Sequence, residues 1–550
     1  MADDKVDSLK DYAVEAAAHG SSQHAEDLAV DREPYGPPGL QGLIYNPFVL
    51  MCAICSTLGG FIFGYDQGVV SVILVMEQFL GTFPRVGGAG SGFWKGLLTA
   101  MIELGALIGA LNQGWIADKI SRRYSILVAV AVFTIGSTLQ TAAVEYGMLT
   151  FARFVGGLGV GMLSMVAPLY IAEISPSECR GTLLVLQEWS IIFGIVIAYW
   201  ITFGTRYMPG EWSWRLPFLL QMVPGFILIA GVIFLPFSPR WLASKGRNEE
   251  ALKTLSRLRK LPTTDRRVRQ EYMDILAEVR FHRETNAERH PNLQGGGAKN
   301  GFLLEIASFA NCFRRGYWRR THIGVMIPFF QQFVGINALI YYSPTLFETM
   351  GFDTNIQLIM SGVLNCLQLV GCSTTIWTMD TVGRRKLLLG GSAAMSMSHI
   401  VIAVLVGLYS SNWAAHQTEG WVSAAFLLVY MIAFGAAWGP VGWAIPSEIF
   451  PSSLRAKGVA LATCSNWLNN FIIGLITPPL IQDTGYGAYV FFAVFCILSG
   501  IWTFFFVPET MGRSLEDMDA VFKDNSSERE RERRRAIEIE LLRERVEGGV

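Results

Sequence analysis

Asp118-Lys-Ile-Ser-Arg-Arg123 is the stretch that decides the fold, because it returns 262 residues later as Asp380-Thr-Val-Gly-Arg-Arg385. A second pair of charges also returns, with its Glu and Arg seven residues apart in both copies: Glu173 with Arg180, and Glu448 with Arg455. Each copy lies between long apolar runs. Charged loops that recur between apolar runs predict a membrane protein with two equivalent halves that move against each other.

The composition supports a membrane protein. Of the 550 residues, 51% are hydrophobic and 16% are charged, whereas soluble domains carry about 25% charged residues. A helix needs roughly 20 apolar residues to cross a bilayer. Twelve runs meet this need: 48–74, 93–115, 125–142, 147–172, 181–203, 214–236, 322–347, 355–378, 386–408, 420–443, 456–480 and 486–507.

A polar segment separates the first six runs from the last six. Between Arg240 and Arg320, Lys and Arg outnumber Asp and Glu, so the positive-inside rule places this segment and both termini in the cytoplasm. The start of the chain does not resemble a cleavable signal peptide, and we expect the first run to act as an uncleaved insertion signal.

The predicted fold class is an all-α membrane protein with twelve transmembrane helices in two pseudo-symmetric six-helix bundles, with a cytoplasmic helical segment between them. The expected divisions are a cytoplasmic N-terminal tail (1–47), a first bundle (48–237), a linker (238–320), a second bundle (321–508) and a cytoplasmic C-terminal tail (509–550).

The sequence gives no sign of an enzyme. It contains no metal-ligand spacing, nucleophile–base pair or nucleotide-binding loop. Cys52 and Cys55 form a Cys-x-x-Cys pair at the start of an apolar run, where small buried side chains are the better interpretation. We therefore predict no metal and no cofactor apart from a coupling proton, and no nucleic acid partner.

Several motifs resemble those of the sugar porter family of the major facilitator superfamily, over about residues 48–522. The matching stretches are Gly59–Asp66, Arg153–Gly157, Tyr170–Glu173, Pro239–Leu242, Gln331–Asn337, Tyr341–Pro344 and Pro508–Arg513. The resemblance implies two six-helix halves around a central site that opens to each side of the membrane in turn. The tails and the large linker resemble those of fungal members.

The resemblance also implies that the charged loops form a cytoplasmic salt-bridge network that holds the outward-open state. The positions that match it are Asp118, Arg122, Arg123, Glu173, Arg180, Arg240, Asp380, Arg384, Arg385, Glu448 and Arg455. Two positions depart from the family pattern, because Ser121 replaces a Gly and Phe237 replaces a Glu. The alternative is that these charges only set the topology.

A sugar needs neutral amides that donate and accept hydrogen bonds, together with an aromatic surface. Gln331, Gln332 and Asn337 cluster in one apolar run, and we expect the helix to unwind near Gly335. The resemblance places sugar contacts at Gln331, Gln332, Asn337, Trp443, Asn466, Trp467 and Asn470. The alternative is that these amides hold helices together and the tryptophans anchor interfaces.

Two positions of the expected sugar site depart from the family pattern. Glu188, next to Gln187, replaces a Gln, and Gln368 stands where an Asn is usual, with Asn365 nearly one turn earlier. We include Gln187, Glu188 and Gln368 in the predicted site. A carboxylate at Glu188 disfavours anionic substrates, and we therefore expect a neutral sugar.

Asp66 lies inside the first apolar run, where a carboxylate is costly and marks a functional site. Arg153, just inside the fourth run, is its expected partner. A carboxylate that exchanges a proton for an arginine as the halves move would couple sugar uptake to proton entry. Glu188 is a rival proton carrier.

The sequence therefore predicts a proton symporter for a neutral monosaccharide, a hexose or a pentose, in the plasma membrane. Its expected partners are the sugar and the lipid bilayer, and it is expected to work as a monomer. The open alternatives are a facilitative uniporter, a transporter of sugar acids or disaccharides, and a sugar sensor that does not transport.

Overall fold

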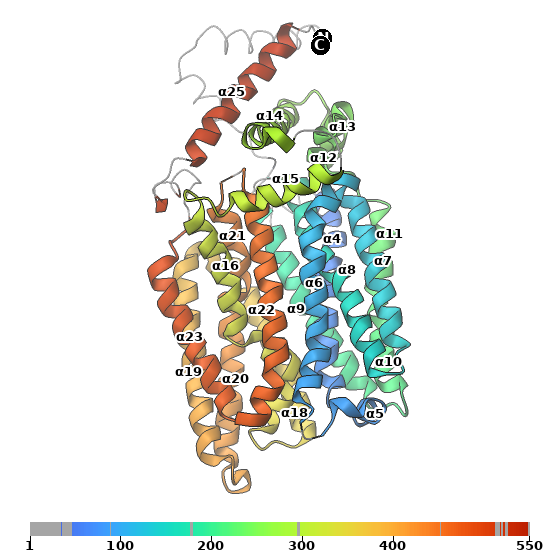
Figure 1. The fold of residues 1–550 in the computed structure, drawn as a ribbon, viewed down its shortest axis with the longest axis vertical. Helices are drawn as coiled ribbons and strands as arrows, with labels where there is room; N and C mark the ends of the chain where they lie inside the picture. The colour runs from blue at the N-terminus through green and yellow to red at the C-terminus, as the bar shows by residue number, and fades with distance from the viewer. Residues whose placement is uncertain are drawn as a thin grey trace.

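A computed structural model describes residues 35, 47–88, 90–176, 180–293, 298–451, 453–511, 518, 521–522 and 526–547. The elements of these residues are α-helices and three short 3-10 turns. Within them, twelve segments are long and apolar enough to cross a membrane, as the sequence predicts. Figure 1 shows these helices side by side in two groups, with a layer of shorter helices across one end.

The first group spans the first six apolar runs. Its helices are α4 (Pro47–Ile73), α6 (Gly92–Ile120), α7 (Arg122–Thr141), α8 (Tyr146–Ile174), α9 (Arg180–Thr205), and α10 (Trp212–Leu220) with α11 (Met222–Val232). A short helix, α5 (Glu77–Thr82), follows α4. Close packing of α6 and α8 depends on Gly157 and Gly161, because a Cβ on either would lie within 2.1 Å of a carbonyl oxygen of α6.

The second group repeats this pattern with two broken helices. It contains α16 (Trp318–Phe333) with α17 (Ile336–Glu348), α18 (Thr354–Thr381), α19 (Arg384–Tyr409), α20 (Gln417–Ala436) with α21 (Trp438–Ile449), α22 (Arg455–Thr484) and α23 (Gly487–Phe506). The unwinding expected near Gly335 is confirmed, since this residue has a φ of 103° between α16 and α17. Ala437 separates α20 from α21 with a φ of −132° and a ψ of −79°.

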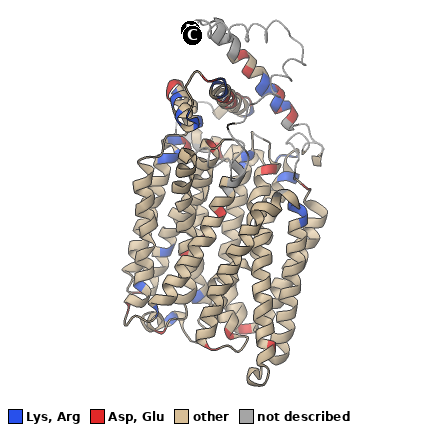
Figure 2. Ribbon diagram, turned by 180° about the vertical axis from the view of Figure 1, so that it is seen from behind, with Lys and Arg blue, Asp and Glu red and all other residues tan. Residues whose placement is uncertain are grey.

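The linker forms a helical layer on the end of the bundles. Its helices are α12 (Pro239–Ser244), α13 (Asn248–Arg259), α14 (Arg266–Arg289) and α15 (Ala298–Asn311), and the tail helix α25 (Ser526–Glu547) packs against α14. Arg259 docks this layer on the first bundle, because its Nη1 donates to the carbonyl of Ile174 at 2.8 Å. In Figure 2 the charged residues gather mainly at this end, and most of the bundle surface is free of them.

The two bundles contact each other at the end away from the linker. The backbone N–H of Gly92 on α6 donates to Gln482 of α22 at 2.9 Å. A second contact joins α9 to α18, where the Tyr199 hydroxyl donates to the carbonyl of Leu358 at 2.6 Å. Nearby, Arg206 donates to Asn355 at 2.6 Å. Hydrogen bonds from two pairs of helices therefore hold this end closed.

Candidate functional site

Buried amides from three helices meet in the second bundle. Gln331, near the end of α16, accepts a hydrogen bond at 2.9 Å from Nδ2 of Asn466 on α22. Its own Nε2 donates to the carbonyls of Trp438 and Gly439, at 3.0 and 3.1 Å. These carbonyls lie at the start of α21, directly after the break in the helix. The break therefore brings backbone acceptors to the same place as the amide side chains.

The break before α17 places a second amide pair beside the first. Nδ2 of Asn337 donates to Oε1 of Gln332 at 2.5 Å, across the turn at Gly335. Asn470, one turn after Asn466 on α22, donates to the Tyr341 hydroxyl at 3.3 Å. All of these side chains are buried. The structure thus brings together the predicted amides at positions 331, 332, 337, 466 and 470.

Side chains of the first bundle lie on the side opposite the amide cluster. Gln187 on α9 is buried, and its Oε1 has no hydrogen-bond partner among the described residues. Glu188, the next residue, points toward α21, because its Oε1 lies 3.9 Å from the place of a Cβ on Gly439. In the second bundle, Gln368 and Asn365 of α18 are also buried, each with a side-chain oxygen that likewise lacks a described partner. Unpaired buried polar atoms of this kind mark a place where a polar ligand or water can bind.

The two tryptophans of the predicted sugar site have different surroundings. Trp443 is half-buried on α21, one residue after Gly442. Trp467 is fully buried against the first bundle, with its ring 4.8 Å from that of Phe63 and its Nε1 donating to Ser164 at 3.3 Å. Trp467 therefore joins the two bundles through apolar packing and one hydrogen bond.

The predicted acid and its arginine lie together inside the first bundle. Oδ1 of Asp66 on α4 is 4.0 Å from Nη1 of Arg153 on α8, and each side chain is only 1% exposed. Arg153 also donates to the carbonyls of Leu98 and Thr99 on α6, at 2.8 and 3.4 Å. The arginine thus connects α4, α6 and α8, and its ion pair with Asp66 is long enough to rearrange.

One buried carboxyl beside this pair is absent from the sequence-based prediction. Glu103 on α6 is 1% exposed and accepts a hydrogen bond from the Tyr341 hydroxyl. Gln67 on α4 donates to the same hydroxyl at 2.9 Å. The signal was available, because Glu103 is the one charged residue between Gly96 and Ala117 of the second apolar run.

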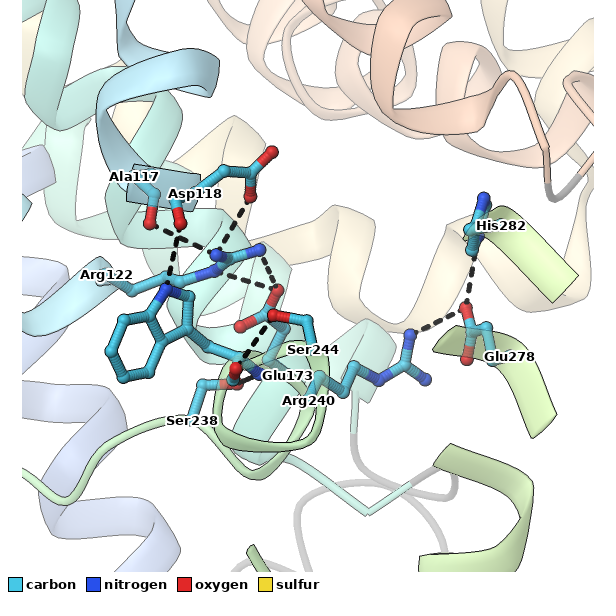
Figure 3. Close-up of polar contacts among 10 residues, drawn as sticks. Ala117, Asp118, Arg122, Glu173, Ser238, Arg240, Ser244, Glu278 and His282 are labelled. Atoms are coloured by element: carbon cyan, nitrogen blue, oxygen red, sulfur yellow. Dashed lines mark hydrogen bonds and ion pairs between the residues drawn. The ribbon is translucent and has the colours of Figure 1, made fainter. Parts of the chain in front are cut away.

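At the linker end, the charged loop of the first bundle forms a compact network (Figure 3). Arg122 pairs with Glu173 at 2.9 Å and with Asp118 at 2.9 Å. Nη1 of Arg122 also donates to the carbonyl of Ala117 at 3.1 Å. Arg123 donates to the carbonyl of Ile233 at 3.0 Å, which fixes the loop to the end of α11.

The second bundle repeats this arrangement at the corresponding places. Arg384 donates to Glu448 at 3.1 Å and to the carbonyl of Met379 at 2.9 Å. Arg385 donates to the carbonyl of Phe504 at 2.6 Å, as Arg123 does to Ile233. Each of these contacts lies within one bundle. They therefore stabilise the linker end of each bundle separately.

Two further predicted charges contact or lie near the linker. Arg240 on α12 pairs with Glu278 of α14 at 2.9 Å. Burial alone would raise the pKa of Glu278, but the positive charge of Arg240 and the neighbouring His282 hold it below its ordinary value. Arg455 is half-buried at the start of α22, near the same carboxylate. The side chains of Arg180 and Asp380 lie outside the described residues.

Comparison with known proteins identifies a family match and several relatives of this chain. Residues 52–522 match the family model described as "Sugar (and other) transporter". The chain is 34% identical over 499 residues to the sugar transporter STL1 of Saccharomyces cerevisiae, covering 88% of this chain and 82% of that one. It is 30% identical to sugar transport protein 13 of Arabidopsis thaliana, covering 86% and 88%.

Solved structures agree with the family match. The proton:xylose symporter XylE bound to 6-bromo-6-deoxy-D-glucose is 28% identical, with a TM-score of 0.69 over 86% of this chain and 99% of that one. A partially occluded inward-open conformation of the xylose transporter XylE from E. coli is 26% identical, with a TM-score of 0.69 over 85% and 100%.

Proposed function

We propose, from the premise that this chain belongs to the sugar porter family of the major facilitator superfamily, that it carries a neutral monosaccharide together with protons. As a member of that family it is a multi-pass membrane protein that transports sugar and is not an enzyme. The proposal concerns the class of sugar, the coupling to protons and the site. The protein works as a monomer by alternating access. It lies in the plasma membrane with both termini in the cytoplasm.

The amide cluster around Gln331 is the observation that carries the proposal. Its members donate to and accept from one another, and a pair can open so that both amides bond to sugar hydroxyls, which leaves no buried group unpaired. Gln187, Gln368 and Asn365 add buried polar atoms from the facing helices that lack described partners. We place Gln187, Glu188 and Gln368 with the amides and Trp443 in the sugar site.

The charge of the site favours a neutral sugar. Glu188 lies opposite the start of α21, close to the carbonyls that Gln331 contacts. The carbonyls and the carboxyl group all present oxygen atoms to this space. An anionic substrate such as a uronate would meet acceptors and no counter-ion there, whereas a sugar hydroxyl can donate to them.

The Asp66–Arg153 pair supports coupling to protons. Both groups are buried, so an ionised Asp66 depends on the arginine for compensation. A proton on Asp66 would free Arg153 to keep its bonds to α6 alone. The XylE relative is described as a proton:xylose symporter. A facilitative uniporter with the same pair would differ in having no link between sugar movement and proton movement.

Uptake of labelled sugars in a host without its own sugar transporters tests the proposal. We expect uptake of glucose or xylose against a gradient, and its loss when a protonophore is added. Equal uptake with and without the protonophore would contradict symport and favour the uniporter. Preference for a uronate or a disaccharide would contradict the assignment of a neutral monosaccharide, and no uptake of any sugar would favour the sensor.

Two isosteric variants separate the candidate proton carriers. Asp66→Asn should abolish accumulation while keeping exchange of labelled for unlabelled sugar across the membrane, because exchange needs no net proton movement. Glu188→Gln should keep accumulation if Glu188 only contacts the sugar. Accumulation by Asp66→Asn at the level of the parent would exclude Asp66 as the carrier.

A further inference from the structure

Glu103 is a buried acid whose hydrogen bonding is incomplete. It lies on α6, with 1% of its surface exposed. Its Oε1 accepts the hydrogen bond of Tyr341, and its Oε2 has no hydrogen-bond partner among the described residues. An ionised carboxylate with a single hydrogen bond is costly inside a membrane, whereas a neutral carboxylic acid with its proton on the second oxygen costs much less.

The hydroxyl of Tyr341 fixes which group donates to which. It accepts from Nε2 of Gln67 at 2.9 Å and from Nδ2 of Asn470 at 3.3 Å, which uses both of its lone pairs. Its single proton goes to Glu103, which is much closer than Oδ1 of Asn470 at 3.5 Å. One hydroxyl therefore joins α4, α6, α17 and α22, so that it links the first bundle to the helices of the amide cluster.

Tyr341 lies on a segment with irregular backbone on both sides. The preceding break is at Gly335, with a φ of 103°, and Tyr342 has non-helical angles of −123° and 19°. Pro344 follows within the same helix. The first turns of α17 are thus bounded by irregular backbone on both sides. The bond to Glu103 is one of the contacts that hold this short segment against the first bundle.

The charged groups around Glu103 are those of the proposed proton pair. Arg153 on α8 and Asp66 on α4 both act on Glu103 electrostatically, and Tyr341 and Tyr342 are the titratable groups of α17 nearby. Arg153 binds the carbonyl of Thr99, which lies one turn before Glu103 on α6. Glu103 therefore shares an arginine with Asp66 and a hydroxyl with the amide cluster.

We propose that Glu103 is a second proton-binding carboxyl, which lets α17 close over the site once it carries a proton. This inference rests on the proposed proton symport. When Glu103 is ionised, closure of α17 would bury a carboxylate with one hydrogen bond, so the open state with hydrated Glu103 is favoured. Protonation of Oε2 removes that penalty, and Tyr341 can then donate to Oε1 in the closed state. Asn470 donates to the Tyr341 hydroxyl, and this bond connects the closure of α17 to the sugar site.

The isosteric variant Glu103→Gln tests this role, because it keeps an acceptor for Tyr341 and cannot titrate. In the parent, the apparent KM for glucose should rise with external pH, by up to about tenfold for each pH unit when one proton is linked. In Glu103→Gln this dependence should become shallower, because Asp66 alone still titrates, accumulation should fall below that of the parent, and exchange should continue. The control is Glu145→Gln, an exposed acid before α8, which should behave as the parent.

The outcomes separate this inference from the proposed function. If the parent accumulates sugar and the KM of Glu103→Gln depends on pH as steeply as that of the parent, the role of Glu103 is wrong and symport stands. If the parent does not accumulate sugar, both fall. Should Glu103→Gln fail to yield folded protein, Tyr341→Phe decides, because loss of the hydroxyl should displace the pH profile of KM. An undisplaced profile would overturn the proposal.

Discussion

Ser121 and Gly383 adopt the same backbone conformation at equivalent turns, 262 residues apart. Ser121 has a φ of 93° and a ψ of 157°, and Gly383 has a φ of 98° and a ψ of 152°. This region is essentially restricted to glycine, because a Cβ is strained there. The two halves therefore repeat a turn geometry even though one of them carries a side chain at its most constrained position.

The difference between the two turns lies in the group that caps the next helix. In the second half, Glu509 accepts from the backbone N–H groups of Arg384 and Arg385 at 2.9 and 3.1 Å, and it fills the space above Gly383. In the first half, Phe237 stands where the family pattern has Glu, and Oγ of Ser121 accepts from the backbone of Tyr124 at 3.3 Å. Ser121 thus supplies a cap where the carboxylate is missing.

We predict that Gly383→Ser will lower the free energy of unfolding, and that Ser121→Gly will change it by a smaller amount. A Cβ on Gly383 would lie 2.6 Å from Oε2 of Glu509, in addition to backbone strain of about 1–3 kcal/mol. Ser121→Gly removes similar strain but also loses a cap worth about 1 kcal/mol. Thermal unfolding of the two purified variants checks this, and equal transition temperatures would contradict it.

The repeated loops and the apolar runs were sufficient to predict the twelve helices and their division into two bundles. Both signals are local, because a span depends on length and composition alone. The break at Gly335 could also be predicted, since amides on several faces of one helix require unwinding. The break at Ala437 comes directly before Trp438-Gly439-Pro440, a Gly- and Pro-containing stretch that marks it equally well in the sequence.

Contacts between distant helices were harder to predict. Glu103 and Tyr341 are 238 residues apart, and neither has a neighbour in the sequence that indicates the other. Trp467 lies beside two predicted sugar-binding asparagines, yet its side chain packs against Phe63 of the other bundle. Helical spacing says which residues share a face of one helix, but the packing of the bundles decides what that face meets.

We predict that Gln331→Ala will weaken sugar binding by about 10- to 100-fold, corresponding to roughly 1–3 kcal/mol for unpaired buried groups. The variant leaves Asn466 and the carbonyls of Trp438 and Gly439 without their partner. The measurement is the apparent KM for the sugar that the parent transports.

The matched control for this variant is Gln140→Ala. Gln140 is also a buried glutamine, but it lies on α7, outside the amide cluster. It should leave the KM close to that of the parent, even if the amount of folded protein falls. An equal rise of KM in both variants would show that Gln331 acts on stability and not on the sugar.

We predict that acid will release the linker helices through Glu271. Its two oxygens accept from Arg259 at 2.9 and 2.6 Å. Burial alone would raise the pKa of Glu271, but the hydrogen bonds and charge of Arg259 hold it below its ordinary value. The pair therefore contributes stability above the ordinary pKa of Glu, about 4.3, and this stability is lost as the pH falls through the lowered pKa.

Hydrogen exchange of α13 and α14 measures this release. In the parent, the protection of these helices from exchange should fall as the pH is lowered through the lowered pKa of Glu271. Glu271→Gln should show weak protection already at neutral pH, because Arg259 is 0% exposed and would keep an uncompensated charge. Glu249→Gln, which removes a 90% exposed acid from α13, is the control and should keep the protection of the parent.

The tail helix α25 connects the linker to the second bundle. Glu530 accepts from the backbone N–H of Ser453, before α22, at 3.0 Å and lies 3.8 Å from Arg289 of α14. Arg533 pairs with Glu288 of α14 at 2.5 Å. Since Arg259 docks the same linker on the first bundle, α25 completes a bridge between the linker ends of the two bundles.

We predict that Glu530→Ala will speed uptake by about two- to fivefold, because separation of these ends must break contacts worth about 0.5–1 kcal/mol. The initial rate of sugar uptake at saturating substrate measures the effect. Glu532→Ala, which removes an exposed acid from the same helix, should leave the rate unchanged. An unchanged rate in Glu530→Ala would mean that the bridge does not resist separation of the two ends. A lowered rate would mean that α25 stabilises the state in which the ends are apart.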